Sequence, residues 1–452
     1  MLAIALPMMI GMTAHMLLNI IDGVFVTRLG MEESLSVLNY GFPFFYLIFA
    51  VFNGLTSGST SVIARYIGAQ EKAKAENTLG QIVIIALGIF VVFLVIYPFA
   101  LPAYLNMQKA TAAGGALTKT YLNTLFLGVP FLILALLWGS GLRAEGNTRT
   151  LMMGMLTGTL VNIVIAPFLI FSNFHFASVE WKGLGLSVAG AGLASTFSNL
   201  LTALVVFSIY ARKQSTLRLC LWPDWKDKSG LTDAFSIGLP SILSQSLIGI
   251  NIFILTRLAS DFGAAAKAAI GIGSRLETLA VFPALSIMIA VLSLVGQNFG
   301  AKRYDRVEQS VRIGLITAFL FLSVVGILVH LFRTHLIQYF QPDFLTLQSA
   351  HHYLGITTIG YGFIGVSIVS SGAFQGLGRG LPFLFLNVLR LVLIATPLGY
   401  FLAHSRGEFG LHYAPLIASG CTAFVAVTWI LTAVHKLRKT SVPIANPVSV
   451  PA

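Results

Sequence analysis

Charged side chains are scarce in this sequence. Asp, Glu, Lys and Arg together make up 10% of the 452 residues, whereas 56% of the residues are hydrophobic. A soluble globular chain carries about 25% charged residues, so this composition leaves too few charges to cover a surface that faces water. Only two cysteines occur, Cys220 and Cys421, which excludes a disulfide scaffold and a cysteine-ligated metal cluster. The composition therefore predicts a membrane protein.

Long apolar runs supply the spans that such a protein needs. A helix crosses roughly 30 Å of hydrocarbon with about 20 apolar residues. Turn or charged residues separate twelve such runs, which lie near 3–27, 36–63, 80–105, 119–141, 150–171, 187–211, 231–256, 268–296, 311–334, 348–374, 381–403 and 411–435. The first run has no basic flank and no cleavage motif, so we interpret it as a retained span. The expected fold is an all-α integral membrane protein with twelve transmembrane helices.

The basic residues between the runs predict the topology. Eighteen Lys and Arg residues fall on the side that holds the loops after even-numbered runs and the C-terminal tail, and eight fall on the other side. The positive-inside rule then predicts a multi-pass protein of the plasma (inner) membrane with both termini in the cytoplasm. This asymmetry accounts for much of the net charge of +12, so no nucleic-acid partner is expected.

Short motifs of the first half of the chain recur in the second half at offsets of 229 to 233 residues. They are ALP at 5–7 and GLP at 238–240, TRL at 27–29 and 256–258, GA at 68–69 and 300–301, and EG at 145–146 with QG at 375–376. Six spans separate the copies, so both halves have the same orientation, as in the parallel repeats of transporters. We expect two pseudo-symmetric six-helix lobes. The predicted divisions are an N-lobe at 1–211, a cytoplasmic linker at 212–230, a C-lobe at 231–438 and a cytoplasmic tail at 439–452.

Four charged residues fall inside the predicted spans. They are Asp22, Arg275, Glu277 and Arg390. A charge at the bilayer centre costs at least about 2.5–3.5 kcal/mol, so each of these charged residues requires a structural or functional explanation. Asp22 can alternate between its protonated and ionised forms, which makes it a candidate coupling group. The alternative is a carboxylate that caps a helix or packs between helices.

The other three charges have a different interpretation. Arg275 and Glu277 are two residues apart and do not face each other on a helix, so Arg390 is the candidate partner of Glu277. A structural ion pair is the favoured interpretation. The other is that these residues, with Asn19, belong to a substrate cavity.

Polar and helix-bending residues accompany Asp22 in the N-lobe. Pro7 and Gly11 precede it on the same span, where proline removes a backbone hydrogen bond and favours a kink. Asn162, Thr196 and Asn199 lie mid-span in the fifth and sixth runs. Their oxygens can hydrogen-bond a carboxylate or ligate a hard cation, although such residues more often bond a neighbouring helix.

The sequence lacks the common nucleotide-binding and catalytic motifs. The sequence contains no ATP-binding loop, nucleophile elbow, zinc-protease motif or kinase motif set, and its nine histidines have no metal-ligand spacing. We therefore expect no enzymatic activity, no cofactor and no metal site. Uphill transport by such a chain would draw on an ion gradient.

The motifs together resemble the multidrug and toxic compound extrusion (MATE) family over nearly the whole chain. In the N-lobe they are DG at 22–23, RLG at 28–30, NG at 53–54, RYIGA at 65–69, RAEGNTR at 143–149, Asn162 with Pro167, and GAGLAST at 190–196. In the C-lobe they are GLP at 238–240, RLE at 275–277 with Pro283, GQNFGA at 296–301 and FQGLG at 374–378.

The resemblance implies roles for several residues. The pattern is similar to the DinF-type branch, in which an aspartate of the first span is the coupling carboxylate, and Asp22 matches that position. Pro7 and Gly11 match the residues about which that helix is thought to bend. The C-lobe carboxylates of the NorM-type branch are not evident in the seventh and tenth spans.

One departure from the family pattern bears on the coupling ion. In the archaeal-type site, an Asn and an Asp four residues later join the first-span Asp and a sixth-span Thr around a cation. Asn162 and Thr196 match this set, but Ala166 stands at the second Asp position. A single carboxylate would charge a sodium site poorly, whereas it can still carry a proton. We therefore favour H⁺ over Na⁺ as the coupling ion.

The sequence as a whole predicts a secondary active multidrug efflux antiporter. It would act as a monomer in the lipid bilayer and export amphipathic, cationic small organic compounds in exchange for protons, by alternating access. The coupling set would be Asp22, Asn162, Thr196 and Asn199. One alternative is a lipid-linked oligosaccharide flippase of the same superfamily, which would need a more cationic cavity. A remote alternative is an intramembrane enzyme, for which no clustered catalytic set is found.

Overall fold

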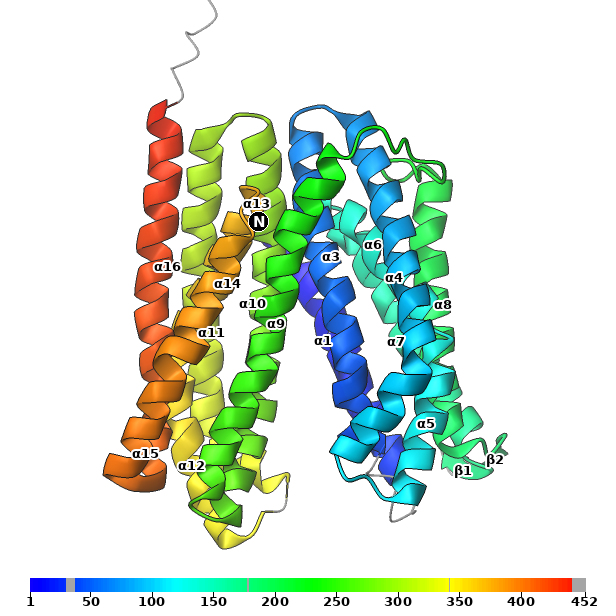
Figure 1. Cartoon of the computed structure of the whole chain (residues 1–452), viewed down its shortest axis with the longest axis vertical. Coiled ribbons are helices and arrows are strands. Elements are labelled where there is room, and N and C mark those ends of the chain that lie inside the picture. Colours follow the sequence, from blue (N-terminus) through cyan, green and yellow to red (C-terminus); the bar gives the residue numbers. More distant parts are fainter. Residues whose placement is uncertain (30–36, 177–178, 341, 441–452) are drawn as a thin grey trace, which may run out of the picture.

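The computed structural model describes residues 1–29, 37–176, 179–340 and 342–440, and it is almost entirely helical. The helices form two bundles that stand side by side (Figure 1). The N-lobe contains α1 (Leu2–Thr27), η1 (Val37–Gly41), α3 (Phe42–Gly68), α4 (Lys72–Met107), α5 (Ala112–Phe126), α6 (Val129–Glu145), α7 (Thr148–Ile170) and α8 (Ser187–Ala211). The C-lobe contains α9 (Ser229–Ser260), α10 (Ala264–Gly300), α11 (Tyr304–Gln338), α12 (Phe344–Thr357), η2 (Thr358–Gly360), α13 (Tyr361–Gly376), α14 (Leu381–Asn387), η3 (Val388–Ala395), α15 (Thr396–Leu411) and α16 (Tyr413–Thr440).

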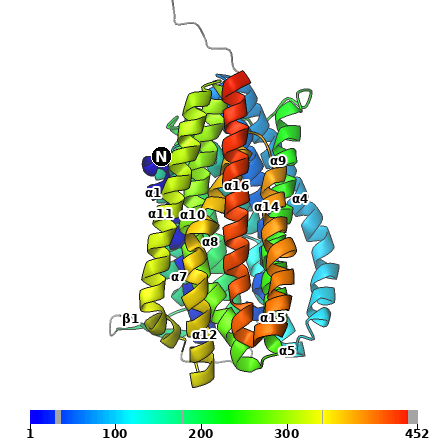
Figure 2. The same ribbon diagram turned by 90° about the vertical axis from the view of Figure 1, so that its left-hand side faces the viewer.

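The expected all-α membrane fold is confirmed. Within the described residues, ten helical segments are long and apolar enough to cross a membrane, and α5 with α6, bent by 48°, supplies an eleventh. Helix α1 adds a further apolar helix of 26 residues. The sequence did not predict one small element, an antiparallel hairpin of β1 (Asn173–Phe176) and β2 (Val179–Lys182) in which Phe174 pairs with Trp181. Figure 2 shows α16 on the outer face of the C-lobe, between α11 and α14.

Local signals in the sequence start several helices. Thr111 caps α5, where its hydroxyl accepts a hydrogen bond from Gly114 N at 3.1 Å. Asp343 caps α12 in the same way, accepting from Thr346 N at 2.7 Å. This bond lowers the pKa of Asp343, because the backbone N–H stabilises the charged carboxylate.

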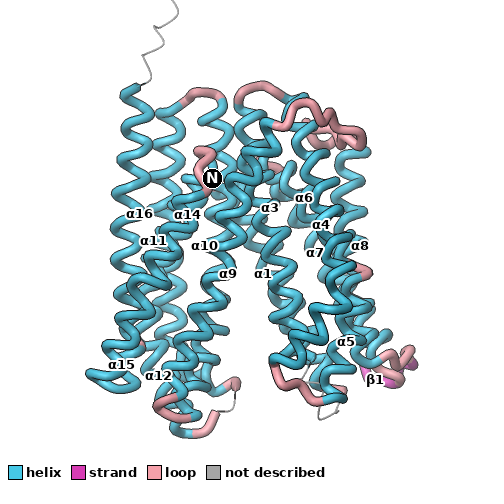
Figure 3. Tube along the Cα trace, in the orientation of Figure 1, coloured by secondary structure: helices cyan, strands magenta, loops and turns pink. Residues whose placement is uncertain are grey.

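The two lobes meet along α3, which packs against α9 and α10 at the end of the molecule that carries the linker. Glycine allows the closest approach of these helices. A Cβ atom at Gly58 would collide with the carbonyl oxygen of Ala234, and one at Gly68 would collide with that of Gln297. We call this contact the lobe seam. Figure 3 shows that the ribbons of the two lobes diverge from the seam toward the opposite end.

A buried glutamine joins both sides of the lobe seam. Gln375 of α13 accepts a hydrogen bond from Ser57 Oγ of α3 at 2.5 Å, and its Nε2 donates to Ser241 Oγ of α9 at 3.3 Å. The backbone oxygen of Gln375 also accepts from Ser61 Oγ. The seam is therefore closed by side-chain hydrogen bonds as well as by backbone packing.

Replacing this glutamine should loosen the seam. Gln375→Leu keeps the side-chain volume but takes the acceptor away from Ser57 Oγ and removes one of the two hydrogen bonds of the buried Ser241 Oγ. We therefore expect a loss of about 1–3 kcal/mol in unfolding free energy. Thermal unfolding of the purified protein in detergent measures the change. Gln338→Leu, at the exposed end of α11, is the control. Equal midpoints for the two variants would contradict the role given to Gln375.

Candidate functional site

A cavity of about 640 Å³ lies between the lobes and is lined by residues of both. From the N-lobe, α1, α3, α6, α7 and α8 contribute, and from the C-lobe α9 to α14, η3 and α16. Along α3, the lining begins at Tyr46 and ends at Thr60, whereas the lobe seam continues to Gly68. The cavity therefore lies on the side of the seam away from the linker.

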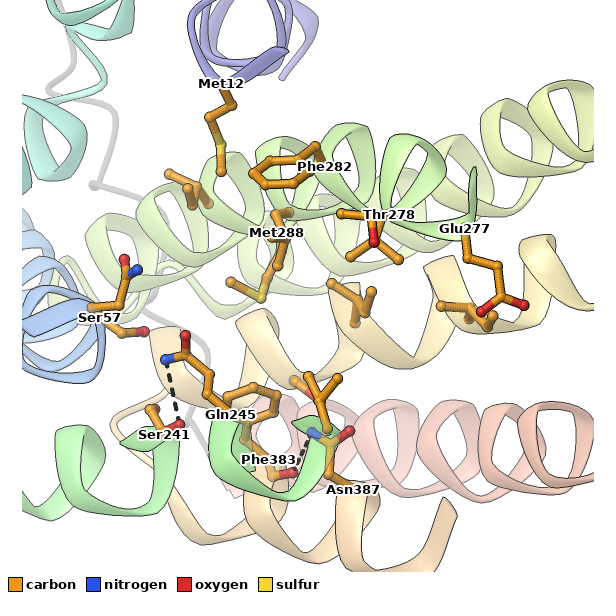
Figure 4. A pocket seen from close by; sticks show the side chains of 18 of the residues that line it. Met12, Ser57, Ser241, Gln245, Glu277, Thr278, Phe282, Met288, Phe383 and Asn387 are labelled. Atoms are coloured by element: carbon orange, nitrogen blue, oxygen red, sulfur yellow. Dashed lines mark hydrogen bonds between the residues drawn. The ribbon is translucent and has the colours of Figure 1, made fainter. Parts of the chain in front are cut away.

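The lining is mostly apolar and adaptable. Figure 4 shows Met12 of α1 approaching Phe282 and Met288 of α10 across the cavity. Methionine is flexible and polarisable, so it can pack against ligands of different shapes. A few polar groups, among them Gln245 of α9 and Asn199 of α8, interrupt this surface. Such a lining selects ligands by apolar contact and by a small number of oriented polar groups.

The N-lobe carboxylate lies beside this cavity. Asp22 is only 8% exposed, and Ser195 Oγ of α8 donates a hydrogen bond to its Oδ2 at 3.2 Å. In the amide orientation that suits its neighbours, Asn162 Nδ2 donates to Asp22 Oδ1 at 3.0 Å and its oxygen accepts from Ser195 N at 3.2 Å. Three helices, α1, α7 and α8, thus converge on one carboxyl group.

The other predicted members of this set lie differently. Thr196 Oγ1 donates to the backbone oxygen of Thr124 in α5, at 2.9 Å. Asn199 lines the central cavity, one helical turn from Ser195 on the same face of α8. Ala166 is fully buried and packs in the apolar core of the N-lobe. The arrangement surrounds Asp22 with neutral hydrogen-bond donors, and the neighbouring turn of α8 links it to the cavity.

The hydroxyl groups of Ser195 and Thr196 in α8 have different hydrogen-bond partners, so their removal should have different effects. Ser195→Ala removes a direct bond to Asp22, so we expect transport to fall several-fold, whereas Thr196→Val should have a smaller effect because that hydroxyl bonds a backbone oxygen. Initial transport rates of the two variants, at matched expression, measure the difference. A larger loss in Thr196→Val would instead favour the cation-binding set that the family resemblance implies.

The candidate bending residues lie in the first half of α1. In this conformation α1 runs unbroken from Leu2 to Thr27 with Pro7 inside it. Gly11 lies against α7, where an added Cβ would come within 3.3 Å of the Met152 Cα atom. Bending at these positions stays a prediction. The side chain of Asn19 lies outside the described residues.

The expected ion pair of the C-lobe is not formed. Glu277 and Arg390 both line the cavity, yet among the described residues no salt bridge within 4.0 Å joins them. Glu277 accepts a hydrogen bond from Tyr353 OH at 3.3 Å, and Arg390 Nη2 donates to Asn387 Oδ1 at 3.2 Å. Arg390 lies in the π-helical stretch η3. Each of the two charged groups therefore bonds to a neutral polar side chain instead of to the other charge. Arg275 is exposed on α10.

Comparison with known proteins bears directly on this architecture. The sequence pattern of the MatE family matches the chain twice, over residues 7–168 and 240–401. The protein belongs to the MatE family. The two matches fall in the two lobes, in accord with the repeats seen in the sequence.

Relatives of this MatE protein are named for multidrug export or multidrug resistance. The chain is 27% identical over 434 residues to "Multidrug export protein MepA" of Staphylococcus aureus (strain MRSA252), covering 94% of this chain and 92% of that one. It is 25% identical over 383 residues to "Probable multidrug resistance protein YoeA" of Bacillus subtilis (strain 168), covering 83% and 80%.

Solved structures of the family have the same fold. One is described as the outward-facing conformation of a multidrug resistance MATE family transporter, and it superposes with a TM-score of 0.90 at 26% identity. Another, described as MATE in the bent conformation, gives a TM-score of 0.88 at 26% identity. Each alignment covers 97% of this chain and 96% of the other.

Sequence reasoning missed three residues of this region. Ser195 is adjacent to the predicted Thr196, and only the helix phase decides which hydroxyl faces Asp22. Tyr353 contacts Glu277 from another helix, and no local sequence pattern predicts such a contact. Arg143, assigned to a loop from sequence, is 7% exposed in α6 and lines the cavity, where its Nη2 donates to Leu136 O at 2.9 Å. Its place as the first residue of the family motif RAEGNTR was the available signal.

Proposed function

We propose that this MatE protein is a secondary active multidrug efflux antiporter, which exports amphipathic, cationic organic compounds in exchange for protons. The observation that carries the proposal is a large apolar cavity between two lobes, with a buried carboxyl group beside it in the N-lobe: Asp22 is hydrogen-bonded to Ser195, which lies one helical turn from the lining residue Asn199. The names of the relatives as multidrug export proteins support the substrate class.

Proton coupling is supported by the groups around Asp22. Its described hydrogen-bond donors are the neutral side chains of Ser195 and Asn162. A neutral shell of this kind leaves the carboxyl group free to change its charge, whereas a sodium ion would need further anionic ligands for tight binding. Ala166, at the position where the family pattern has a second aspartate, offers no such ligand. Asp22 is therefore the proposed coupling group, and Na⁺ is the less favoured ion.

The proposed cycle uses the two faces of the molecule in turn. With the linker in the cytoplasm, as the basic residues predict, the cavity of this conformation faces outward and the lobe seam closes the cytoplasmic side. Asp22 takes a proton from outside, α1 rearranges near Pro7 and Gly11, and substrate is displaced outward. Solved structures of the family are described in an outward-facing and in a bent conformation, which supports more than one conformation in the cycle. The protein is proposed to work as a monomer with both termini in the cytoplasm.

An imposed ion gradient tests the coupling ion. Purified protein in sealed vesicles should move a fluorescent organic cation when only a pH difference is applied, and a sodium difference at constant pH should have little effect. Transport that follows sodium and ignores pH would reverse the choice of ion. Accumulation of the cation against its own gradient with neither ion gradient imposed would contradict secondary active export.

The flippase alternative is less well supported by the cavity. Its charged lining consists of Arg143 and Arg390 with the acidic Glu277, which is a weak positive surplus for a pyrophosphate-linked oligosaccharide. Flipping of a fluorescent lipid-linked sugar in the same vesicles, with no export of organic cations, would favour it.

A further inference from the structure

Two opposite charges line the cavity without pairing. Glu277 of α10 and Arg390 of η3 both belong to the lining, and each lies close enough to feel the charge of the other. Within the described chain, however, no salt bridge of 4.0 Å or less joins them. Opposite charges in an apolar cavity attract strongly. A structural role would bring them into contact, so their separation requires another explanation.

The carboxylate side of this pair is open to a ligand. Glu277 accepts a hydrogen bond from Tyr353 OH at 3.3 Å, which is long for a bond between oxygens. The Thr357 hydroxyl is a second neighbour of this carboxyl group. Ionised carboxylates offer about four lone-pair positions, so two hydroxyl donors still leave capacity for a ligand. Figure 4 shows Glu277 at the edge of the same cavity as Phe282 and Thr278, from α10. A ligand ammonium group could approach here.

The guanidinium group of Arg390 also has unused hydrogen-bonding capacity. Arg390 Nη2 donates to Asn387 Oδ1 at 3.2 Å, and the Asn387 amide nitrogen is held by Ser244 Oγ at 2.6 Å, which fixes the orientation of the acceptor. Arg390 Nε is buried and, among the described atoms, has no hydrogen-bond partner. A buried unsatisfied donor costs about 1–3 kcal/mol, so this nitrogen has a strong preference for an acceptor. A carboxylate matches the planar donor edge of a guanidinium.

We propose that Glu277 and Arg390 form a bipolar recognition site for zwitterionic substrates. The ammonium group of the substrate binds Glu277, its carboxylate binds Arg390, and its apolar body packs on Phe282 and Met288. This inference rests on the proposed export function and adds a substrate class to it. The protein would thus discriminate compounds that carry both charges from compounds that carry only one.

Arg143 is the other arginine of the cavity lining and provides a comparison. It belongs to the N-lobe, and its described hydrogen bond goes to Leu136 O of its own helix. The zwitterion site lies in the C-lobe, so Arg143→Gln should not reproduce the charge selectivity that is lost in Arg390→Gln.

A matched set of three probes tests the proposal. They are an aromatic amino acid with a fluorescent side chain, its methyl ester, which is a cation, and its N-acetyl derivative, which is an anion. Binding to the full-length purified protein is measured for Glu277→Gln, Arg390→Gln and Arg143→Gln, with Arg406→Gln on the exposed surface of α15 as the control. We expect zwitterion affinity to fall about tenfold or more in each of the first two variants. Glu277→Gln should weaken the ester alone among the single-charge probes, and Arg390→Gln only the N-acetyl derivative.

Several outcomes would overturn the inference. Equal losses for the zwitterion and the ester in Glu277→Gln, with no effect of Arg390→Gln, would mean a simple cation site. An Arg143→Gln variant that loses carboxylate selectivity would move the anion site to the N-lobe. A structural ion pair would appear as unfolding midpoints that fall in both single variants and recover when the two are combined. In each case, export of the ester under a pH gradient would leave the proposed function standing, whereas its absence in the unaltered protein would remove that function instead.

Discussion

Asp22→Asn is expected to abolish pH-driven export. Asparagine keeps the shape of the side chain and its capacity to accept a hydrogen bond from Ser195, but it cannot take up or release a proton. One pH unit supplies about 1.36 kcal/mol per proton, enough for a tenfold substrate gradient at a one-to-one exchange. Without a titrating group this free energy cannot reach the substrate. Accumulation against a gradient should therefore disappear, and only downhill movement should remain.

The measurement needs a control for the loss of a surface carboxylate. Asp261→Asn removes an exposed carboxylate that pairs with Arg257 at 2.7 Å, a contact worth little in free energy. Both variants are reconstituted into vesicles at equal protein density, and concentrative uptake is followed at an imposed pH difference. Normal accumulation by Asp22→Asn would show that the coupling group lies elsewhere in the chain. Substrate binding at constant pH should persist, because Asp22 lies outside the described lining of the cavity.

The second large effect is expected at the lobe seam. Gly58→Leu introduces a side chain where the backbone of α9 leaves no room, since even a Cβ atom would collide with Ala234 O. Backbone atoms cannot move aside as a flexible side chain can. The two lobes should therefore fail to close on the linker side, and transport should fall more than tenfold although each lobe remains folded.

Thiol labelling reports whether the seam has opened. Cys220 and Cys421 are first replaced by serine, and Ser61, which is buried at the seam, is replaced by cysteine. The new thiol should react with a membrane-impermeant reagent from the linker side only when Gly58→Leu is also present. Gly88→Leu is the control, because nothing lies within 4 Å of a Cβ atom at that position. A protected thiol together with normal transport in Gly58→Leu would rule out the seam as the closing element.

The architecture could be predicted from sequence because it depends on large, repetitive signals. Apolar runs of span length and a repeat offset near 230 residues give helices and two lobes, whatever the details of packing. The short hairpin at Phe174 and Trp181 was not predicted, because four-residue strands in a loop have no comparable periodicity. Family motifs identified Asp22 and Asn162, which the structure brings together at 3.0 Å.

The hydrogen-bond partners in the candidate site could not be predicted, because they depend on helix phase and on contacts between segments that are distant in the sequence. A rotation of one residue along α8 decides that Ser195, rather than Thr196, contacts the carboxyl group. Glu277 and Arg390 were expected to pair because their charges are opposite and both are intramembrane. Their side chains instead bond to Tyr353 and Asn387, and no sequence spacing encodes that choice.

The segment between the lobes has a mechanical consequence. Its backbone is anchored to the N-lobe at both ends, because Glu145 accepts from Leu217 N at 2.9 Å and Gln81 Nε2 donates to Asp224 O at 2.6 Å and Asp227 O at 2.8 Å. A linker bound to the N-lobe at both ends cannot extend, so it moves with the N-lobe as one rigid unit. A rotation of the C-lobe relative to the N-lobe must then bend α9 itself. Pro240, inside that helix, marks the position where α9 can bend.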